Sequence, residues 1–231
     1  MAARQQRIVA EDTRAIRGLV DVRSPSAEPF RMLRLAVDLR PRQNKDVQPP
    51  IIFTSADAGE GKSTIAANYA LVAAQSNRRV LLIDADLRKP SQHRLFGVRG
   101  APGLTEVIAA NMDYRELVAP IQSQPGVLHL LTAGTPLPNA GDVAASDAMR
   151  TLFASAMATY DLVVVDSPPL LAAADAATLA SHAGADVAFV VARGTKRRRV
   201  TRAVAKLDLV GANLLGFIMN REGQLSEYGS Y

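Results

Sequence analysis

Short apolar runs alternate with segments of helical period from residue 51 to residue 221, and this alternation constrains the fold more than any other feature of the chain. The runs lie in the segments IIFTSA, RRVLLIDAD, VLHLLTAG, YDLVVVDSPP, ADVAFVVAR and LLGFIMNR. They lack polar–apolar alternation, which is typical of strands buried on both faces. Helices between such strands cross over a parallel sheet. The sequence therefore predicts an α/β fold, with a mostly parallel β-sheet flanked by helices on both faces.

The intervening segments carry the helical pattern. They are KSTIAANYALVAAQ, LTEVIAAN, YRELVAP, SDAMRTLFASAMATY, DAATLASH and RRRVTRAVAKLDLVG. No internal repeat or low-complexity segment interrupts the series. One α/β domain is expected to hold all of them.

The residues on either side of this series differ from it in composition. Residues 1–24 are polar and Arg-rich, and we expect a flexible N-terminal arm. Residues 25–40 are expected to form a helix, with Ser26 as its N-cap and Pro29 in its first turn. The predicted domain then spans residues 25–221, and the polar residues 222–231 are expected to form a C-terminal tail.

Composition excludes several kinds of site. The chain has no cysteine, so disulfides, thiolate metal sites and cysteine nucleophiles are ruled out. The first residues lack the apolar segment of a secretory signal, and we find no apolar stretch long enough for a membrane span. The formal net charge of +5 favours nucleotide, acidic lipid or acidic protein surfaces without selecting one of them.

A glycine-containing loop joins the first strand to its helix, in the segment FTSADAGEGKST. It matches the phosphate-loop pattern G-x-x-x-x-G-K-[ST], except that Ala56 holds the first position. Glycines let backbone N–H groups turn toward phosphate oxygens, and the following helix adds its positive end. We expect a nucleotide triphosphate, ATP, to bind here, with Mg²⁺. The candidate nucleotide contacts are Ala58, Gly59, Glu60, Gly61, Lys62, Ser63 and Thr64.

Three aspartates stand at the ends of two predicted strands. Asp84 and Asp86 close VLLIDAD, and Asp166 closes LVVVD. Ligands of open parallel sheets bind at the carboxyl ends of strands, which is also where the phosphate loop lies. Mg²⁺ needs only one or two carboxylates when phosphate and water complete its shell. A further carboxylate is then available to accept a proton from an attacking hydroxyl.

This surplus carboxylate is compatible with two classes of enzyme. A water-activating ATPase and a hydroxyl-phosphorylating kinase share the loop and the metal. They differ in the nucleophile beside the base, which is water in the ATPase and a substrate hydroxyl in the kinase. The spacing of the residues does not choose between them.

Taken together, DAGEGKST, VLLIDADLRKP and YDLVVVDSPP resemble the bacterial tyrosine kinases, P-loop proteins of capsule and exopolysaccharide assembly that share the Min/Par-like fold. The similarity extends over about residues 20–221, through PSQHRLFGV, AGTPLPNAGDVAASDAM and LLGFIMNR. It implies an ATP-dependent protein-tyrosine kinase of cytoplasmic location. The related partition-type ATPases carry a lysine at the position of Asp57, which disfavours that third function.

The resemblance also implies roles for individual residues. The catalytic positions of the family match Lys62, Asp84 and Asp86. Of these, Asp84 matches the residue that activates the tyrosine hydroxyl. The choice between Asp84 and Asp86 for this role stays open. Ser63, Asp86 and Asp166 match the magnesium side of the site, and Asn220 matches a residue that contacts the adenine.

Assembly is implied by the motif E-x-x-R-x-x-R, formed by Glu28, Arg31 and Arg34. Spacing alone favours a solvated charged face with a local ion pair, whereas the resemblance implies a ring-like homo-oligomer. It implies further partners: a membrane-bound polysaccharide co-polymerase that activates the kinase and recruits it to the inner face of the membrane, and a tyrosine phosphatase. No nucleic-acid partner is implied.

Tyr228 and Tyr231, in the predicted tail, are the expected autophosphorylation sites, modified in trans within the oligomer. The alternative is an ATP-binding scaffold of an export complex with little kinase activity. The densest basic run, residues 193–200, is expected to be the solvated start of a helix. Contact with nucleotide, acidic lipid or the tail of another chain is its functional alternative.

Overall fold

The computed structural model describes residues 18–40, 48–137 and 140–220. Tyr228 and Tyr231 lie outside these residues. The strands form one sheet in the order β3-β4-β2-β5-β1-β6-β7, in which only β3 runs antiparallel to its neighbour. Their bounds are β1 Ile51–Ser55, β2 Arg79–Asp84, β3 Ala119–Ile121, β4 Val127–Leu131, β5 Leu162–Asp166, β6 Asp186–Ala192 and β7 Asn213–Asn220. The predicted α/β class with a mostly parallel sheet is confirmed.

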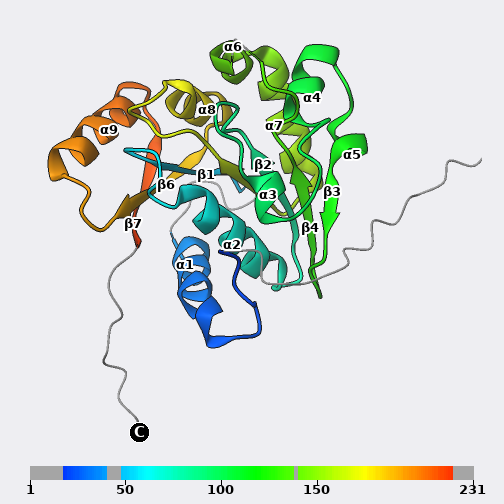
Figure 1. Ribbon diagram of the computed structural model, residues 1–231, viewed down its shortest axis with the longest axis horizontal. Coiled ribbons are helices and arrows are strands. Elements are labelled where there is room, and N and C mark those ends of the chain that lie inside the picture. Colours follow the sequence, from blue (N-terminus) through cyan, green and yellow to red (C-terminus); the bar gives the residue numbers. More distant parts are fainter. Residues whose placement is uncertain (1–17, 41–47, 138–139, 221–231) are drawn as a thin grey trace, which may run out of the picture.

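Helices cover both faces of this sheet (Figure 1). The first three pack on one face and the last six on the other. Their bounds are α1 Glu28–Asp38, α2 Lys62–Ala74, α3 Gln92–Leu95, α4 Leu104–Ala110, α5 Tyr114–Leu117, α6 Ala140–Ala145, α7 Asp147–Thr159, α8 Asp175–Ala183 and α9 Arg197–Leu209. No helix of the described ranges is both long and apolar enough to cross a membrane.

The core lies in two layers because successive strand residues point to opposite faces. In β1, Phe53 packs with the α1–α2 layer and Ile52 with the α4–α9 layer. Leu82 and Leu81 of β2 divide in the same way. Strands buried on both sides explain why the sequence shows uninterrupted apolar runs.

The prediction was wrong for residues 119–120. We expected YRELVAP to be helical, but α5 ends at Leu117 and β3 begins at Ala119. Pro120 has no backbone N–H and is tolerated because β3 is an edge strand. Tertiary pairing with β4 therefore overrides the local pattern.

The chain before α1 also departs from the expectation. Residues 18–24, the end of the predicted arm, run against α2, where Asn68 bonds the carbonyl of Gly18 and the amide of Val20 at 2.8 Å each. The helix predicted over 25–40 is a 3-10 turn, Pro25–Ala27, followed by α1. Ser24 caps that turn, and α1 has no side-chain cap at its own start, so Ser26 is not the N-cap.

Candidate active site

The phosphate loop connects β1 to α2 and requires glycine at two positions. Gly59 and Gly61 have φ of 83° and 94°, in the left-handed region that other residues rarely adopt. A Cβ on Gly61 would lie 2.1 Å from Asn220 Nδ2. The Asn220 side chain donates instead to the carbonyl oxygen of Glu60 at 2.8 Å. The end of β7 therefore lies directly against the loop.

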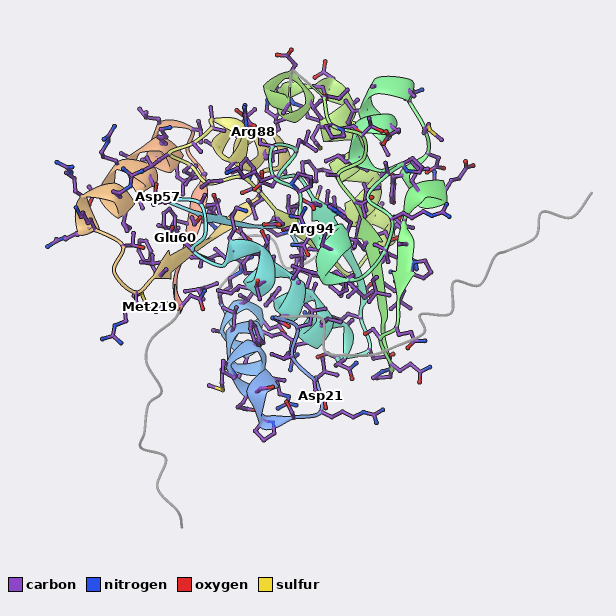
Figure 2. The ribbon with its side chains drawn as sticks, in the orientation of Figure 1. Asp21, Asp57, Glu60, Arg88, Arg94 and Met219 are labelled. Atoms are coloured by element: carbon purple, nitrogen blue, oxygen red, sulfur yellow. The ribbon has the colours of Figure 1, made fainter. Side chains whose placement is uncertain are left out.

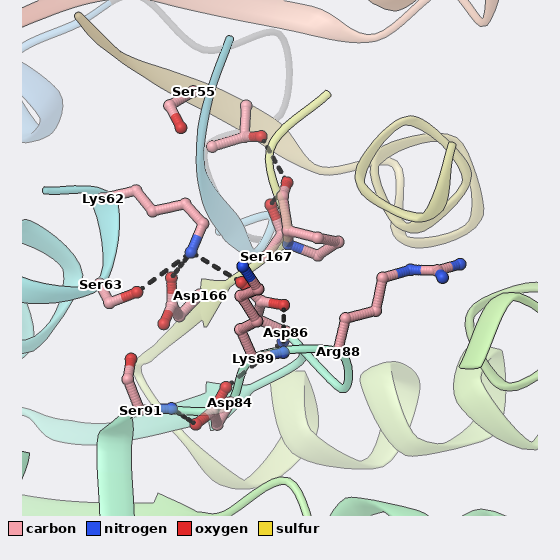
Figure 3. Close-up of polar contacts among 12 residues, drawn as sticks. Ser55, Lys62, Ser63, Asp84, Asp86, Arg88, Lys89, Ser91, Asp166 and Ser167 are labelled. Carbon is pink, nitrogen blue, oxygen red and sulfur yellow. Dashed lines mark hydrogen bonds and ion pairs between the residues drawn. The ribbon is translucent and has the colours of Figure 1, made fainter. Parts of the chain in front are cut away.

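Lys62, the first residue of α2, is buried among acceptors (Figure 3). Its Nζ lies 2.8 Å from Asp86 Oδ2, 3.1 Å from Ser63 Oγ and 3.7 Å from Asp166 Oδ1. Burial alone would lower the lysine pKa, but the charges of Asp166 and Asp86 outweigh it and raise the pKa. The ammonium therefore stays charged where the phosphates are expected.

The sheet register brings two of the predicted aspartates together. Asp84 ends β2 and Asp166 ends β5, and these neighbouring parallel strands place the two residues side by side. Asp86 follows two residues after Asp84, and its carboxylate accepts from the backbone N–H of Lys89 at 3.1 Å. The three carboxylates, predicted from two separate motifs, thus meet beside Lys62.

Asp84 is completely buried and its orientation is fixed by the backbone. One oxygen accepts from the amides of Ser91 and Gln92 at 3.0 and 2.9 Å, and the other from the amide of Asp86 at 3.3 Å. Burial, with the charge of Asp166 beside it, raises the pKa of Asp84 to about 8. Once ionised, such a carboxylate is a stronger base than an exposed aspartate.

Asp166 is also completely buried, and burial raises its pKa. Its Oδ2 accepts from Gln92 Nε2 at 2.8 Å. Its Oδ1 has no hydrogen-bond partner within the described part of the chain, although Lys62 lies nearby. A buried carboxylate oxygen without a hydrogen bond, next to the Ser63 hydroxyl and the Asp86 carboxylate, fits the oxygen ligands that Mg²⁺ prefers.

The same part of the chain contains no cluster of three or more His, Asp or Glu side chains that could hold a metal unaided. Mg²⁺ at a nucleotide site does not need one, because phosphate oxygens and water supply most ligands. The residues present therefore fit a metal that arrives with the nucleotide.

Gln92 is a site residue that sequence reasoning missed. It is fully buried, and its side-chain amide bridges Asp166 and the carbonyl oxygen of Ser63, the latter at 3.0 Å. Its backbone N–H also holds Asp84. Its position in the sequence, six residues after Asp86 and inside the segment PSQHRLF, could have pointed to the site. A glutamine by itself does not indicate a contact with a buried carboxylate.

A second set of contacts ties the loop to the start of α9. Asp57 pairs with Arg199, and Glu60 accepts from the Thr195 hydroxyl. Figure 2 shows Asp57 and Glu60 on the side of the sheet next to α9. The bond to Arg199 lowers the pKa of Asp57. The basic run is therefore not only a solvated helix start, because one of its arginines holds the phosphate loop.

The E-x-x-R-x-x-R motif lies on α1, and both arginines have partners within the chain. Arg31 pairs with Glu28 at 2.8 Å and donates to the carbonyl of Val22 at 2.7 Å. Arg34 lies 3.3 Å from Asp38. Asp38 is held more tightly by Arg78, through two bonds of 2.9 Å. Arg34 could therefore leave Asp38 without unpairing a carboxylate.

Of the remaining predicted contacts, Ala58 lies exposed in the loop and Thr64 lies in the first turn of α2, beside Gly18. The structure thus brings together Lys62, Ser63 and the three aspartates, with Asn220 against the loop. The α1 motif belongs to a separate surface.

The chain is similar to known proteins over most of its length. A family model of the ParA group, described as NUBPL iron-transfer P-loop NTPase, matches residues 46–228. The tyrosine-protein kinase YwqD of Bacillus subtilis is 37% identical over 222 residues, covering 94% of this chain and 91% of that protein. The solved kinase domain of Escherichia coli tyrosine kinase ETK superposes with a TM-score of 0.83 at 30% identity, covering 98% of this chain and 88% of that one.

A more distant likeness concerns the fold alone. The septum site-determining protein MinD from Pyrococcus horikoshii, solved with Mg-ADP, has a TM-score of 0.63 at 22% identity and covers 77% of this chain and 72% of that one. The predicted Min/Par-like P-loop fold is confirmed.

Proposed function

Because the chain belongs to the family of bacterial tyrosine-protein kinases, we propose that it transfers the γ-phosphate of ATP to Tyr228 and Tyr231 of a second copy of itself. The observation that carries this proposal is the convergence of Lys62 with Asp84, Asp86 and Asp166 at one edge of the sheet. A positively charged group for the phosphates and a spare buried carboxylate are what hydroxyl phosphorylation requires.

In the proposed reaction, the tyrosine oxygen bonds to the γ-phosphorus while the bond from that phosphorus to the β,γ-bridging oxygen breaks, and ADP leaves. The tyrosine proton passes to Asp84. Lys62 holds the β- and γ-phosphates as a fixed charge. Mg²⁺ held at Ser63, Asp86 and Asp166 supplies further neutralisation of the phosphate charge when bound.

The structure adds a requirement to this scheme. Asp84 is fully buried and both of its oxygens accept backbone N–H groups. Access of a hydroxyl to Asp84 would require a local rearrangement, and a shift of the segment 86–92 would release at least one of these bonds. We propose that binding of nucleotide, which draws Lys62 away from Asp86, triggers this shift.

Assembly and context follow the same proposal. The α1 motif would dock on a neighbouring copy, giving a ring-like homo-oligomer, and residues 222–231 would be the tail delivered to the neighbour's site. A membrane-bound polysaccharide co-polymerase would activate the kinase and hold it at the inner face of the cell membrane. Cycles of autophosphorylation, reversed by a phosphatase, would regulate capsule or exopolysaccharide assembly.

The test is phosphotyrosine labelling in the full chain, co-expressed with the cytoplasmic segment of a cognate activator. The wild type should label strongly. Lys62→Met should abolish the signal, because it removes the charge that holds the phosphates. The Tyr228→Phe/Tyr231→Phe pair should abolish it as well, while ATP hydrolysis or nucleotide binding persists.

One outcome would replace the proposal with the scaffold function. If the wild type binds ATP and joins the export complex yet acquires no phosphotyrosine, kinase activity on the tail is excluded. Thermal melts of each variant, with and without Mg-ATP, show whether loss of labelling reflects loss of the fold.

A further inference from the structure

The start of α9 carries an exposed basic surface that the site does not use. We define the α9 basic surface by its exposed cations, Arg193, Lys196, Arg197, Arg198 and Arg202. No acidic residue occurs between positions 193 and 207. None of the five forms an ion pair with a carboxylate of the described residues, whereas Arg199 between them pairs with Asp57.

The orientation of α9 keeps this surface facing outward. Ala203 and Leu207 are buried against the α4–α9 layer, which fixes the opposite side of the helix toward solvent. Arg198 and Arg202 stand four residues apart on that outer side, one turn from each other. Figure 2 shows nitrogen-tipped side chains projecting outward from α9. Guanidinium groups at this spacing suit an anion with several oxygens, such as phosphate.

We propose that the α9 basic surface binds the phosphorylated C-terminal tail, residues 222–231, of the same chain. This rests on the proposed function, because it takes Tyr228 and Tyr231 as the phosphorylated residues. Each phosphate adds about −1.5 to −2 charges, next to Glu222 and Glu227 of the same segment.

The place where the tail begins favours it as the occupant. The backbone N–H of Arg193, in the α9 basic surface, donates to the carbonyl oxygen of Asn220 at 2.9 Å. The tail therefore starts at one edge of the surface. Tyr228 follows Asn220 by eight residues, which span up to roughly 27 Å when extended. The first two turns of α9 cover only about 11 Å, so the tail can reach every cation.

A membrane surface is the less favoured partner. Amphipathic helices that lie on bilayers place apolar side chains beside their cations. The large exposed apolar residues here are Leu209, the last residue of α9, and Val210, its C-cap, so they stand at the other end of the helix. Tethering also gives the tail a high effective concentration that a free ligand lacks.

Binding of the phosphorylated tail to the α9 basic surface would also affect the phosphate loop. Arg199 lies between Arg198 and Arg202 in sequence and holds Asp57 of the loop. A phosphate at the surface competes with Asp57 for Arg199. A phosphorylated tail would thus be kept from active sites while it loosens one of the contacts that hold the loop.

The experiment uses a fluorescent synthetic peptide of residues 221–231, phosphorylated at both tyrosines, and the full chain carrying Tyr228→Phe/Tyr231→Phe. Anisotropy should show the phosphopeptide binding about tenfold more tightly than its unphosphorylated form, because each charge-assisted bond contributes on this scale. Arg198→Glu/Arg202→Glu should weaken binding at least about tenfold, and Arg198→Gln/Arg202→Gln less.

A matched control reverses the charge of two exposed arginines on α5 and α7, helices that lie away from α9 (Figure 1). Arg115→Glu/Arg150→Glu makes the same charge change and should leave affinity within about twofold. A second form of the chain, with phosphotyrosines installed at 228 and 231 by peptide ligation, should bind added phosphopeptide several-fold more weakly, because its own tail occupies the surface.

The inference is overturned if the two peptides bind equally, if Arg198→Glu/Arg202→Glu binds as the parent does, or if the ligated chain binds as strongly as the Phe variant. Binding to phosphatidylglycerol vesicles without binding of the phosphopeptide would assign the surface to the membrane instead. Since the peptide is synthetic, these results do not depend on whether the chain phosphorylates itself.

Discussion

Two groups of residues in this molecule pair a cation with carboxylates, one group in buried and the other in exposed surroundings. Around the phosphate loop, the Lys62, Asp86 and Asp166 side chains are 11%, 4% and 0% exposed. On α1, Glu28 and Arg31 are 58% and 38% exposed. The buried group has shifted pKa values at Lys62 and Asp166. Glu28 and Arg31 form the local ion pair that their three-residue spacing predicts.

The difference shows what burial adds to a charge. An exposed ion pair typically contributes only about 0–1 kcal/mol, because water and salt screen it. Removing one partner of a buried pair costs about 3–5 kcal/mol, because the other charge is left in a low dielectric. The buried group is therefore suited to chemistry, and the α1 group to reversible contact with another surface.

The largest expected effect separates the roles of Asp84 and Asp86, two of the three aspartates beside Lys62. Asp84→Asn should lower kcat for tail phosphorylation by roughly 10²–10⁴-fold with little change in the KM for ATP, because it removes the proposed base. Asp86→Asn should mainly raise the KM for Mg-ATP, because Asp86 is a proposed ligand of the metal. Steady-state kinetics on a peptide of residues 221–231 would measure both; the reverse pattern would make Asp86 the base.

A smaller effect on kcat is expected for Gln92, whose side chain contacts Asp166 and Ser63 and not the reacting groups themselves. Gln92→Ala removes the hydrogen bond to Asp166 and the bond to the Ser63 carbonyl. We expect kcat to fall about tenfold, the scale of one bond to a charged group. Arg94→Ala, on the exposed side of the same short helix, serves as the control. Equal activity of the two variants would show that Gln92 only fills space.

A third prediction concerns Glu106, a partly exposed carboxylate whose pKa is set by its hydrogen-bond donors more than by its burial. Burial would raise its pKa, but hydrogen bonds from Thr135 and from the amide of Gly103 outweigh this and lower the pKa to about 2. Since the folded value lies below the ordinary 4.5, ionised Glu106 stabilises the fold above pH 4.5. This stabilisation is lost as the pH falls toward 2.

Glu106→Gln should therefore lower the free energy of unfolding by about 1 kcal/mol at pH 7, a value reduced for its partial exposure. The difference should shrink as the pH is lowered from 4 toward 2. Urea unfolding at both ends of this range measures it. A difference that is independent of pH would mean that the lost contacts are steric and not ionic.

The smallest effect on the fold is expected on α1. Arg31→Ala/Arg34→Ala should change the free energy of unfolding of the single chain by less than about 1 kcal/mol, because both pairs are partly exposed and Arg78 still holds Asp38. The mass of the oligomer, measured by light scattering, should nevertheless fall. An unchanged mass would exclude α1 as the docking surface.

The strands and the site could be predicted because their signals are local. Buried strands give continuous apolar runs, and the loop needs Gly59, Gly61 and Lys62 at fixed spacing. The strand β3 and the role of Gln92 could not. Pro120 enters the sheet only because β4 offers an edge, and Gln92 matters only because β5 carries Asp166 to it.

By itself, the sequence determined the six buried strands, the longer helices between them, the phosphate loop and which residues could carry the reaction, because these depend on period, glycine and spacing along the chain. Only the tertiary structure decided which charges face one another. It placed Arg199 on Asp57, buried Asp84 beneath the amides of Ser91 and Gln92, and set the α9 basic surface beside the start of the tail. Strand order and helix packing bring such distant segments together, and the dielectric that results sets the strength of each charge.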